Sequence, residues 1–110
     1  MDDEWNVVPS RWKSDGKTRA KTRDEHQRMF EMLKNLYTKY HNSTKVCCIC
    51  CNIQISDPIV GHVIAASKGG LFIASNLRLT CKSCEVDTDI HTLKPHKMQR
   101  KFHSWMFGMK

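Results

Sequence analysis

Six cysteines in two closely spaced groups are the residues of this chain best suited to chemistry. The pairs with Cys-x-x-Cys spacing are Cys47/Cys50, the overlapping Cys48/Cys51, and Cys81/Cys84. Two such pairs can supply four thiolates to one tetrahedral zinc ion, and that ion ties together the two ends of the segment between them. The spacing therefore predicts one structural zinc site that uses only one of the two overlapping pairs.

A single histidine, His62, lies between the two cysteine groups. It follows Gly61 and precedes a Gly69-Gly70 turn. A neutral imidazole near pH 7 can act as a general base once a partner fixes its tautomer. A metal that pins both ends of this segment would hold His62 in a defined loop, so the pattern suggests a nuclease.

The cellular context of the cysteines decides between metal binding and disulfides. An even number of cysteines would also suit disulfides in a secreted protein. The sequence opens Met1-Asp2-Asp3-Glu4, without an apolar signal segment, and it has no stretch as long as a membrane span. We therefore expect an intracellular protein, cytoplasmic or nuclear, with reduced thiols and no membrane partner.

Basic charge is concentrated at the two ends of the 110-residue chain, whose formal net charge is +7. Residues 1–45 carry ten Lys/Arg and seven Asp/Glu, residues 46–93 carry three and four, and residues 94–110 carry five and none. This distribution suits a metal-handling centre between flanks that hold a polyanion such as DNA. A basic tail kept for solubility is the alternative for residues 94–110.

The sequence pattern around these residues predicts an α+β fold, and it divides the chain into four parts. These are a basic flexible arm (1–21), an amphipathic helix (22–45), a zinc-bound domain (46–93) and a basic C-terminal helix (94–110). Thr22 and Glu25 have capping-box spacing, and an apolar stripe follows at helical intervals. Its members are Met29, Phe30, Leu33, Leu36, Tyr37 and Tyr40.

The central part should contain a hairpin followed by a helix. Residues 59–64 have the composition of a strand, and residues 71–73 are its expected hairpin partner across the Gly69-Gly70 turn. A helix is expected over 82–91, and a last helix from Pro95 to about Phe107, since proline suits a first helical position.

The ordered motifs of residues 45–92 resemble the HNH endonucleases of the ββα-metal (His-Me finger) class. The motifs are Cys-x-x-Cys, Gly-His-Val-Ile-Ala-Ala-Ser-Lys-Gly-Gly, and Asn-Leu-Arg-Leu-Thr-Cys-Lys-Ser-Cys. They are especially similar to phage and large-DNA-virus versions with a four-cysteine zinc site. The resemblance implies a small zinc-stapled ββα-metal domain with flanking helices. It also implies a viral protein, for which the viral factory of an infected cell is a further expected location.

The resemblance also implies roles for individual residues. His62 would be the general base, and Asn76 would tether the loop that orients it. The resemblance favours Cys47, Cys50, Cys81 and Cys84 as the zinc ligands. Family members usually have an apolar residue before the first Cys-x-x-Cys pair and a small residue after it, and Val46 and Cys51 fit these two positions.

The catalytic metal site departs from the family pattern. Gly61 stands where the family usually has an acidic ligand before the histidine, and glycine offers only a carbonyl. Glu85 follows the last cysteine at the other ligand position, and His91 lies where some members carry their last histidine. An Mg²⁺ or Mn²⁺ ion could be held by Glu85 and His91, by one of them with waters, or not at all.

The leading hypothesis is a metal-dependent DNA endonuclease that hydrolyses phosphodiester bonds. The candidate DNA contacts are Lys68, Arg78, Lys82, Lys97, Arg100 and Lys101. One alternative is a zinc-stapled DNA-binding protein whose catalytic metal site has decayed at Gly61. A second is a junction resolvase, which would need a homodimer, and the helix at 22–41 could supply that interface.

Overall fold

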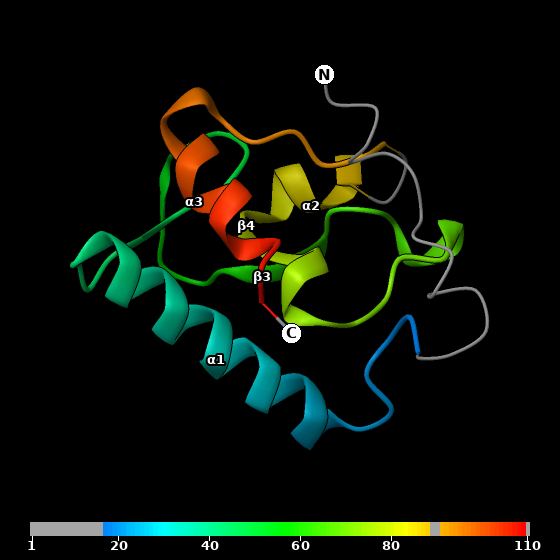
Figure 1. Cartoon of the computed structure of the whole chain (residues 1–110). Coiled ribbons are helices and arrows are strands. Elements are labelled where there is room, and N and C mark those ends of the chain that lie inside the picture. Colours follow the sequence, from blue (N-terminus) through cyan, green and yellow to red (C-terminus); the bar gives the residue numbers. More distant parts are fainter. Residues whose placement is uncertain (1–16, 89–90, 110) are drawn as a thin grey trace.

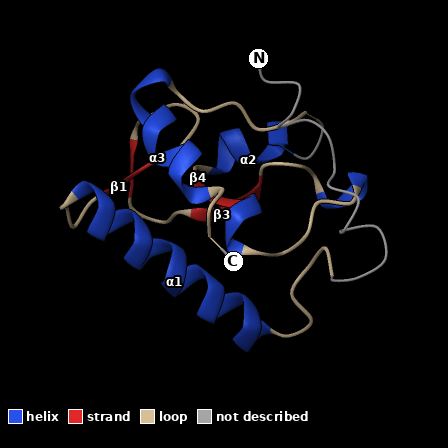
Figure 2. Ribbon diagram, in the orientation of Figure 1, coloured by secondary structure: helices blue, strands red, loops and turns tan. Residues whose placement is uncertain are grey.

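Two small antiparallel sheets lie among three α-helices in the computed structural model, which describes residues 17–88 and 91–109 (Figures 1 and 2). The helices are α1 (Arg23–His41), α2 (Lys82–Thr88) and α3 (Arg100–Met106), with 3-10 turns at Ala66–Lys68, Ala74–Asn76 and Lys97–Gln99. The strands are β1 (Val46–Cys47), β2 (Gln54–Ile55), β3 (Ile59–His62) and β4 (Leu77–Thr80). The expected α+β class is confirmed for the part of the chain described. Most of the expected N-terminal arm, residues 1–16, lies outside it.

Helix α1 begins where the capping pattern predicts. The Thr22 side chain accepts a hydrogen bond from the Glu25 N–H at 3.1 Å, and the Glu25 carboxylate accepts one from the Lys21 N–H at 2.7 Å. Glu25 also pairs with Lys17. The helix ends at Asn42, whose left-handed φ of 50° suits an asparagine C-cap. Local side chains therefore define both ends of α1.

One face of α1 packs on the core, as its apolar stripe predicts. Leu33 and Tyr37 are buried, and Met29, Phe30 and Leu36 are partly buried against the same cluster. The Tyr37 ring meets the Phe102 ring of α3 edge-on, with centroids 5.1 Å apart. Helix α1 therefore packs against the C-terminal helix in the same core.

The two sheets each contain one antiparallel pair. Strand β1 pairs with β2 through Val46–Ile55 and Cys47–Gln54, and β3 pairs with β4 from Ile59–Thr80 to His62–Leu77. Helix α2 follows β4 and packs against β3. The element order in this region is therefore strand, strand, helix.

The expected hairpin partner of β3, residues 71–73, is wrong. The backbone groups of this segment bind elsewhere: the Leu71 carbonyl accepts from the Asn76 side chain at 3.0 Å, and the Phe72 N–H donates to the Lys17 carbonyl at 2.8 Å. Strand β4, which is buried along its whole length, takes the place beside β3. The expected strand at 59–64 accordingly ends at His62.

Asn76 braces the long loop that connects β3 to β4. Its side chain accepts from the Ile64 N–H at 2.9 Å and donates to the Ile64 and Leu71 carbonyls at 3.1 and 3.0 Å. Gly70 lies next to the Asn76 amide and the Ile64 carbonyl, where a Cβ atom would stand 1.7 Å from the Ile64 carbonyl oxygen. The loop therefore requires glycine at position 70, and its tethering matches the role expected for Asn76.

The C-terminal region forms a short 3-10 turn and then α3, instead of one helix from Pro95. Phe102 and Met106 are buried, whereas Met98 and Trp105 of the expected apolar stripe are 70% and 41% exposed. Leu93 lies in the same core cluster. Residues 93–106 are therefore part of the folded domain as well as a source of basic charge.

Arg78 is buried in the core, so its expected role as a DNA contact is wrong. It is 1% exposed, and its guanidinium donates to the carbonyls of Ala74, Ser75, Leu77 and His103. Its Nε–H also donates to Nδ1 of His103 at 3.1 Å, and its guanidinium carbon lies 4.8 Å from the centre of the Phe107 ring. Arg78 therefore joins β4 to α3.

Burial lowers the pKa of both Arg78 and His103, which favours their neutral forms. Burial lowers the pKa of Arg78 to about 9. Burial lowers the pKa of His103 to about 3, and the Arg78 charge adds to that effect. Since Nδ1 of His103 accepts from Arg78, a neutral imidazole is the form that the fold holds.

Acidification should destabilise the fold through His103. The pKa of His103 is about 3 in the folded state against an ordinary 6.5. The unfolded chain therefore binds this proton first, and stability that is complete above pH 6.5 is lost as the pH falls toward 3. One such group lowers the free energy of unfolding by about 1.4 kcal/mol per pH unit.

The replacement His103→Asn tests this, because it keeps an acceptor near the position of Nδ1 but does not titrate. Urea unfolding at pH 7, 6 and 5 should show a steeper loss of stability in the wild type than in the variant. Acid effects on the cysteines are common to both proteins and cancel in the comparison. Parallel pH profiles would contradict the assignment.

Candidate functional site

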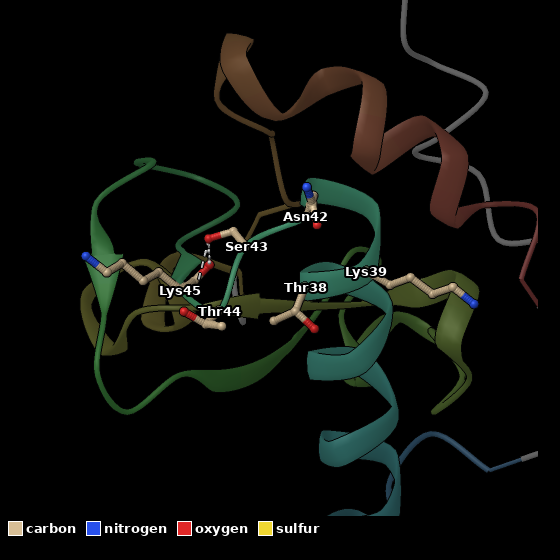
Figure 3. A pocket seen from close by; sticks show the side chains of 6 residues that line it. All are labelled: Thr38, Lys39, Asn42, Ser43, Thr44 and Lys45. Atoms are coloured by element: carbon tan, nitrogen blue, oxygen red, sulfur yellow. Dashed lines mark hydrogen bonds between the residues drawn. The ribbon is translucent and has the colours of Figure 1, made fainter.

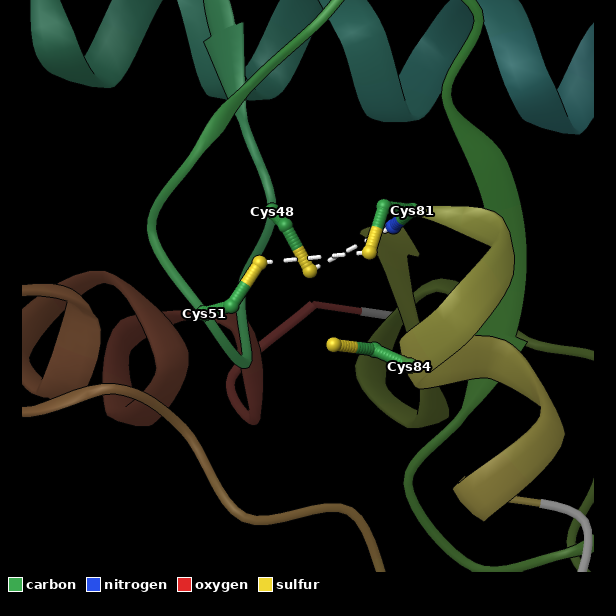
Figure 4. A group of neighbouring side chains, drawn as sticks. All are labelled: Cys48, Cys51, Cys81 and Cys84. Carbon is green, nitrogen blue, oxygen red and sulfur yellow. Dashed lines mark hydrogen bonds between the residues drawn. The ribbon is translucent and has the colours of Figure 1, made fainter.

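Four thiols converge on one point beside the start of α2, and they belong to Cys48, Cys51, Cys81 and Cys84 (Figure 4). Their Sγ atoms all lie within 4.8 Å of one another, and those of Cys51 and Cys81 are 3.9 Å apart. A tetrahedral zinc ion with bonds of about 2.3 Å separates its sulfur ligands by about 3.8 Å. This group could therefore hold a metal ion such as zinc with little movement.

The structure brings Cys48 and Cys51 to this cluster in place of the expected Cys47 and Cys50. Cys47 lies in β1 opposite Gln54, and its N–H donates to the Tyr37 hydroxyl at 3.2 Å. Successive side chains along a strand point to opposite sides, so the next residue, Cys48, is turned inward and is fully buried. The expectation of Cys47 and Cys50 as ligands is therefore corrected.

Cys50 and Asn52 shape the loop that presents the first pair. The Cys50 N–H donates to the Cys48 sulfur at 3.4 Å, and the Cys81 N–H does the same at 3.3 Å. Asn52 has a left-handed φ of 62°, and its N–H donates to the Cys48 carbonyl at 2.8 Å. An asparagine directly after Cys51, able to adopt this conformation, is the sequence signal that favours the Cys48/Cys51 pair.

The electrostatics of the cluster suit a cation. Hydrogen bonds from the Cys50 thiol and from nearby backbone N–H groups lower the pKa of Cys48 to about 3, against the effect of burial. Burial, followed by the neighbouring thiols, raises the pKa of Cys51 and of Cys84. One thiolate thus opposes ionisation of the others, and a bound divalent cation would offset that repulsion and release protons.

An open cavity of about 590 Å³ lies where β3 faces the beginning of α1 and the first turn of α2. His62 and Glu85 both line it, and so does Gly61. Both side chains are partly exposed, and the His62 ring lies 6.1 Å from that of Phe72. The cavity therefore brings together two of the residues expected to act in catalysis.

The backbone of an upstream segment fixes the tautomer of His62. Nε2 of His62 lies 2.7 Å from the Thr18 carbonyl oxygen. A carbonyl oxygen only accepts hydrogen bonds, so in the neutral ring Nε2 carries the hydrogen and Nδ1 is the basic nitrogen. The geometry thus defines which atom of His62 could take a proton.

The other predicted site residues are distributed differently. His91 is exposed, follows the described part of α2, and does not line the cavity with Glu85. The expected ion site of Glu85 with His91 therefore stays a prediction. Among residues 17–88 and 91–109, the cysteine cluster is the one group of three or more His, Cys, Asp or Glu side chains placed to share an ion. The remaining predicted DNA contacts, Lys68, Lys82, Lys97, Arg100 and Lys101, are all exposed.

Sequence reasoning missed one wall of the cavity. Arg19, Lys21, Arg23 and His26 line it from the segment before α1 and the first turns of that helix. His26 also stacks on Phe72, with ring centroids 5.9 Å apart. These residues lie about forty positions before His62, and local patterns carry no signal for such a distant contact.

A second hollow lies at the end of α1 and carries no comparable constellation. It is lined by Thr38, Lys39, Asn42, Ser43, Thr44 and Lys45. Figure 3 shows the Lys39 and Lys45 side chains extending in opposite directions, so their charges do not converge on a common point. This hollow follows from the turn that ends α1.

Comparisons of the chain with models of known families, with characterised proteins and with solved structures found no match. Across the described residues, none of the helices combines the length and apolar character needed to cross a membrane.

Proposed function

We propose that this chain is a metal-dependent endonuclease that hydrolyses phosphodiester bonds in DNA, with a structural zinc ion on Cys48, Cys51, Cys81 and Cys84. The observation that carries the proposal is that His62 and Glu85 line the same cavity. His62 lies on β3 and Glu85 on α2, and the cysteine cluster joins the loop between β1 and β2 to the junction of β4 with α2. The resemblance of residues 45–92 to HNH endonucleases supports the same assignment.

His62 would act as the general base in this proposal. Its Nδ1 takes a proton from a water molecule, and the resulting hydroxide oxygen attacks the phosphorus atom of the scissile diester. The bond from phosphorus to the leaving oxygen then breaks, and that oxygen takes a proton from solvent. The Thr18 carbonyl stabilises the protonated ring, because it accepts the hydrogen on Nε2.

Glu85 would hold the catalytic ion. A carboxylate is a suitable ligand for Mg²⁺ or Mn²⁺, which commonly bind one or two protein carboxylates together with waters and substrate phosphate oxygens. Such an ion would supply stabilisation of the negative charge that develops on the phosphate and the leaving oxygen. His91 is not needed for this arrangement.

A DNA-binding protein without cleavage activity is the second candidate. The observation that favours it is Gly61, which lines the cavity beside His62 but offers no side-chain ligand. Zinc binding and DNA binding would persist in such a protein. Cleavage therefore discriminates between the two candidates, and binding does not.

The zinc-loaded protein should convert supercoiled plasmid to nicked or linear DNA when Mg²⁺ or Mn²⁺ is added. Gly61→Asp should raise the rate about tenfold, equivalent to about 1.4 kcal/mol in the barrier, because it adds a carboxylate beside His62. Gel assays of both proteins on plasmid and branched DNA measure this. If neither protein cuts any substrate with any divalent ion, the binding-protein alternative is correct.

A further inference from the structure

The cavity has a basic wall next to His62 that the proposed chemistry does not use. Arg19, Lys21 and Arg23 line this wall, and all three are exposed. Glu85 is the only acidic residue among the described residues that line the cavity. The cavity as a whole is therefore suited to an anion.

Backbone hydrogen bonds hold this wall against the domain. The Lys17 carbonyl accepts from the Phe72 N–H at 2.8 Å, and the Thr18 carbonyl accepts from His62 at 2.7 Å. The Lys21 N–H donates to the Glu25 carboxylate at 2.7 Å. Residues 17–21 thus bind the domain, although the sequence assigned them to a flexible arm, and their position next to His62 is built into the fold.

The charges of the wall remain available to a ligand. The Glu25 carboxylate, in the first turn of α1, pairs with Lys17 and with the Lys21 N–H, and these contacts lower the pKa of Glu25. Within the described part of the chain, Arg19 and Arg23 form no ion pair. Guanidinium groups match phosphate oxygens in both charge and geometry.

We propose that Arg19, Lys21 and Arg23 bind the phosphodiester backbone of the nucleic acid substrate, and that they seat one phosphate between this wall and His62. This inference rests on the proposed function, because it assigns the substrate-binding half of the same cavity. A volume of about 590 Å³ lies within the range of small-ligand sites, so the cavity receives a short stretch of one strand. The contacts go to phosphates, so they position the strand without reading its sequence.

The test compares two double variants with the same change in charge. Arg19→Ala/Arg23→Ala removes two cations from the wall, and Arg28→Ala/Lys39→Ala removes two exposed cations of α1 that lie outside the cavity. Binding of a fluorescent DNA duplex to the zinc-loaded protein is measured by anisotropy at several salt concentrations, without Mg²⁺ or Mn²⁺. Circular dichroism confirms that each variant is folded.

The wall variant should bind at least tenfold more weakly at 0.1 M salt, and the slope of log affinity against log salt should fall by about two. The control variant should change both quantities much less, and Arg19→Lys/Arg23→Lys should restore most of the affinity because it keeps the charges. Equal losses in the wall and control variants would overturn the proposal.

Failure of this inference can be told apart from failure of the proposed function. If the wall variant alone loses affinity but the wild type never cleaves, the wall binds DNA and the nuclease proposal fails. If the wild type cleaves and the wall variant keeps full affinity, the nuclease proposal survives and the wall assignment is wrong.

Discussion

Serine in place of Cys48 or Cys51 should abolish tight zinc binding and unfold the chain, whereas serine in place of Cys47 or Cys50 should leave both nearly unchanged. The first two residues have sulfur atoms in the four-thiol cluster, and the other two do not. A thiolate zinc site contributes apparent free energy on the order of 10 kcal/mol to folding. Elemental analysis and thermal unfolding of the four variants measure zinc content and stability.

The double variant Cys47→Ser/Cys50→Ser is the matched control for this prediction. It removes as many thiols as Cys48→Ser/Cys51→Ser but keeps the Cys50 N–H that donates to the Cys48 sulfur. Its stability should change by only about 1 kcal/mol, as for an ordinary polar substitution. Zinc retained in the Cys48/Cys51 double variant and lost from the control would reinstate the pair that the sequence resemblance favours.

Replacing His62 by alanine should lower the cleavage rate about 10²–10⁴-fold, because loss of a general base typically costs that much. Zinc content should not change, since His62 does not belong to the thiol cluster. DNA affinity should fall far less than the cleavage rate, because the hydrogen bond from the Phe72 N–H to the Lys17 carbonyl still holds the basic wall when the His62 contact with Thr18 is lost. Single-turnover cleavage with Mg²⁺, together with anisotropy binding, separates these effects.

His91→Ala is the control for the histidine prediction. His91 is exposed and lies outside the cavity, so its removal should leave the rate within about threefold of the wild type. A large loss for His91→Ala would instead support the ligand role that the sequence resemblance suggested. If His62→Ala cleaves as fast as the wild type, the general base has been assigned to the wrong residue.

Local sequence patterns predicted the elements that local interactions determine. The Thr22 cap and the apolar stripe placed α1 within one or two residues, and the strand beginning at Ile59 was found because its residues favour extended structure. The loop tether at Asn76 followed from the family resemblance, and its three side-chain hydrogen bonds agree with that role. His62 and Glu85, which that resemblance named as catalytic residues, line one cavity.

The parts that sequence reasoning missed depend on contacts between distant residues. Leu71 and Phe72 had the composition of a hairpin strand, but Asn76 and Lys17 take their backbone groups. Arg78 has the charge of a DNA contact, but buried carbonyls and His103 hold it in the core. The Thr18 contact with His62 joins residues 44 positions apart, and no local pattern encodes it.

The two overlapping cysteine pairs have a consequence for how the metal ligands are chosen. Cys47/Cys50 and Cys48/Cys51 have the same spacing and the same donor atoms, so coordination chemistry alone does not distinguish them. The surrounding structure distinguishes them: Val46 and Cys48, two positions apart, are both buried, whereas Cys47 lies opposite Gln54 in the β1–β2 pair and is only partly buried. The surrounding protein packing therefore specifies which four thiols could hold a metal at this centre, and a bound metal would stabilise an arrangement that the fold already has.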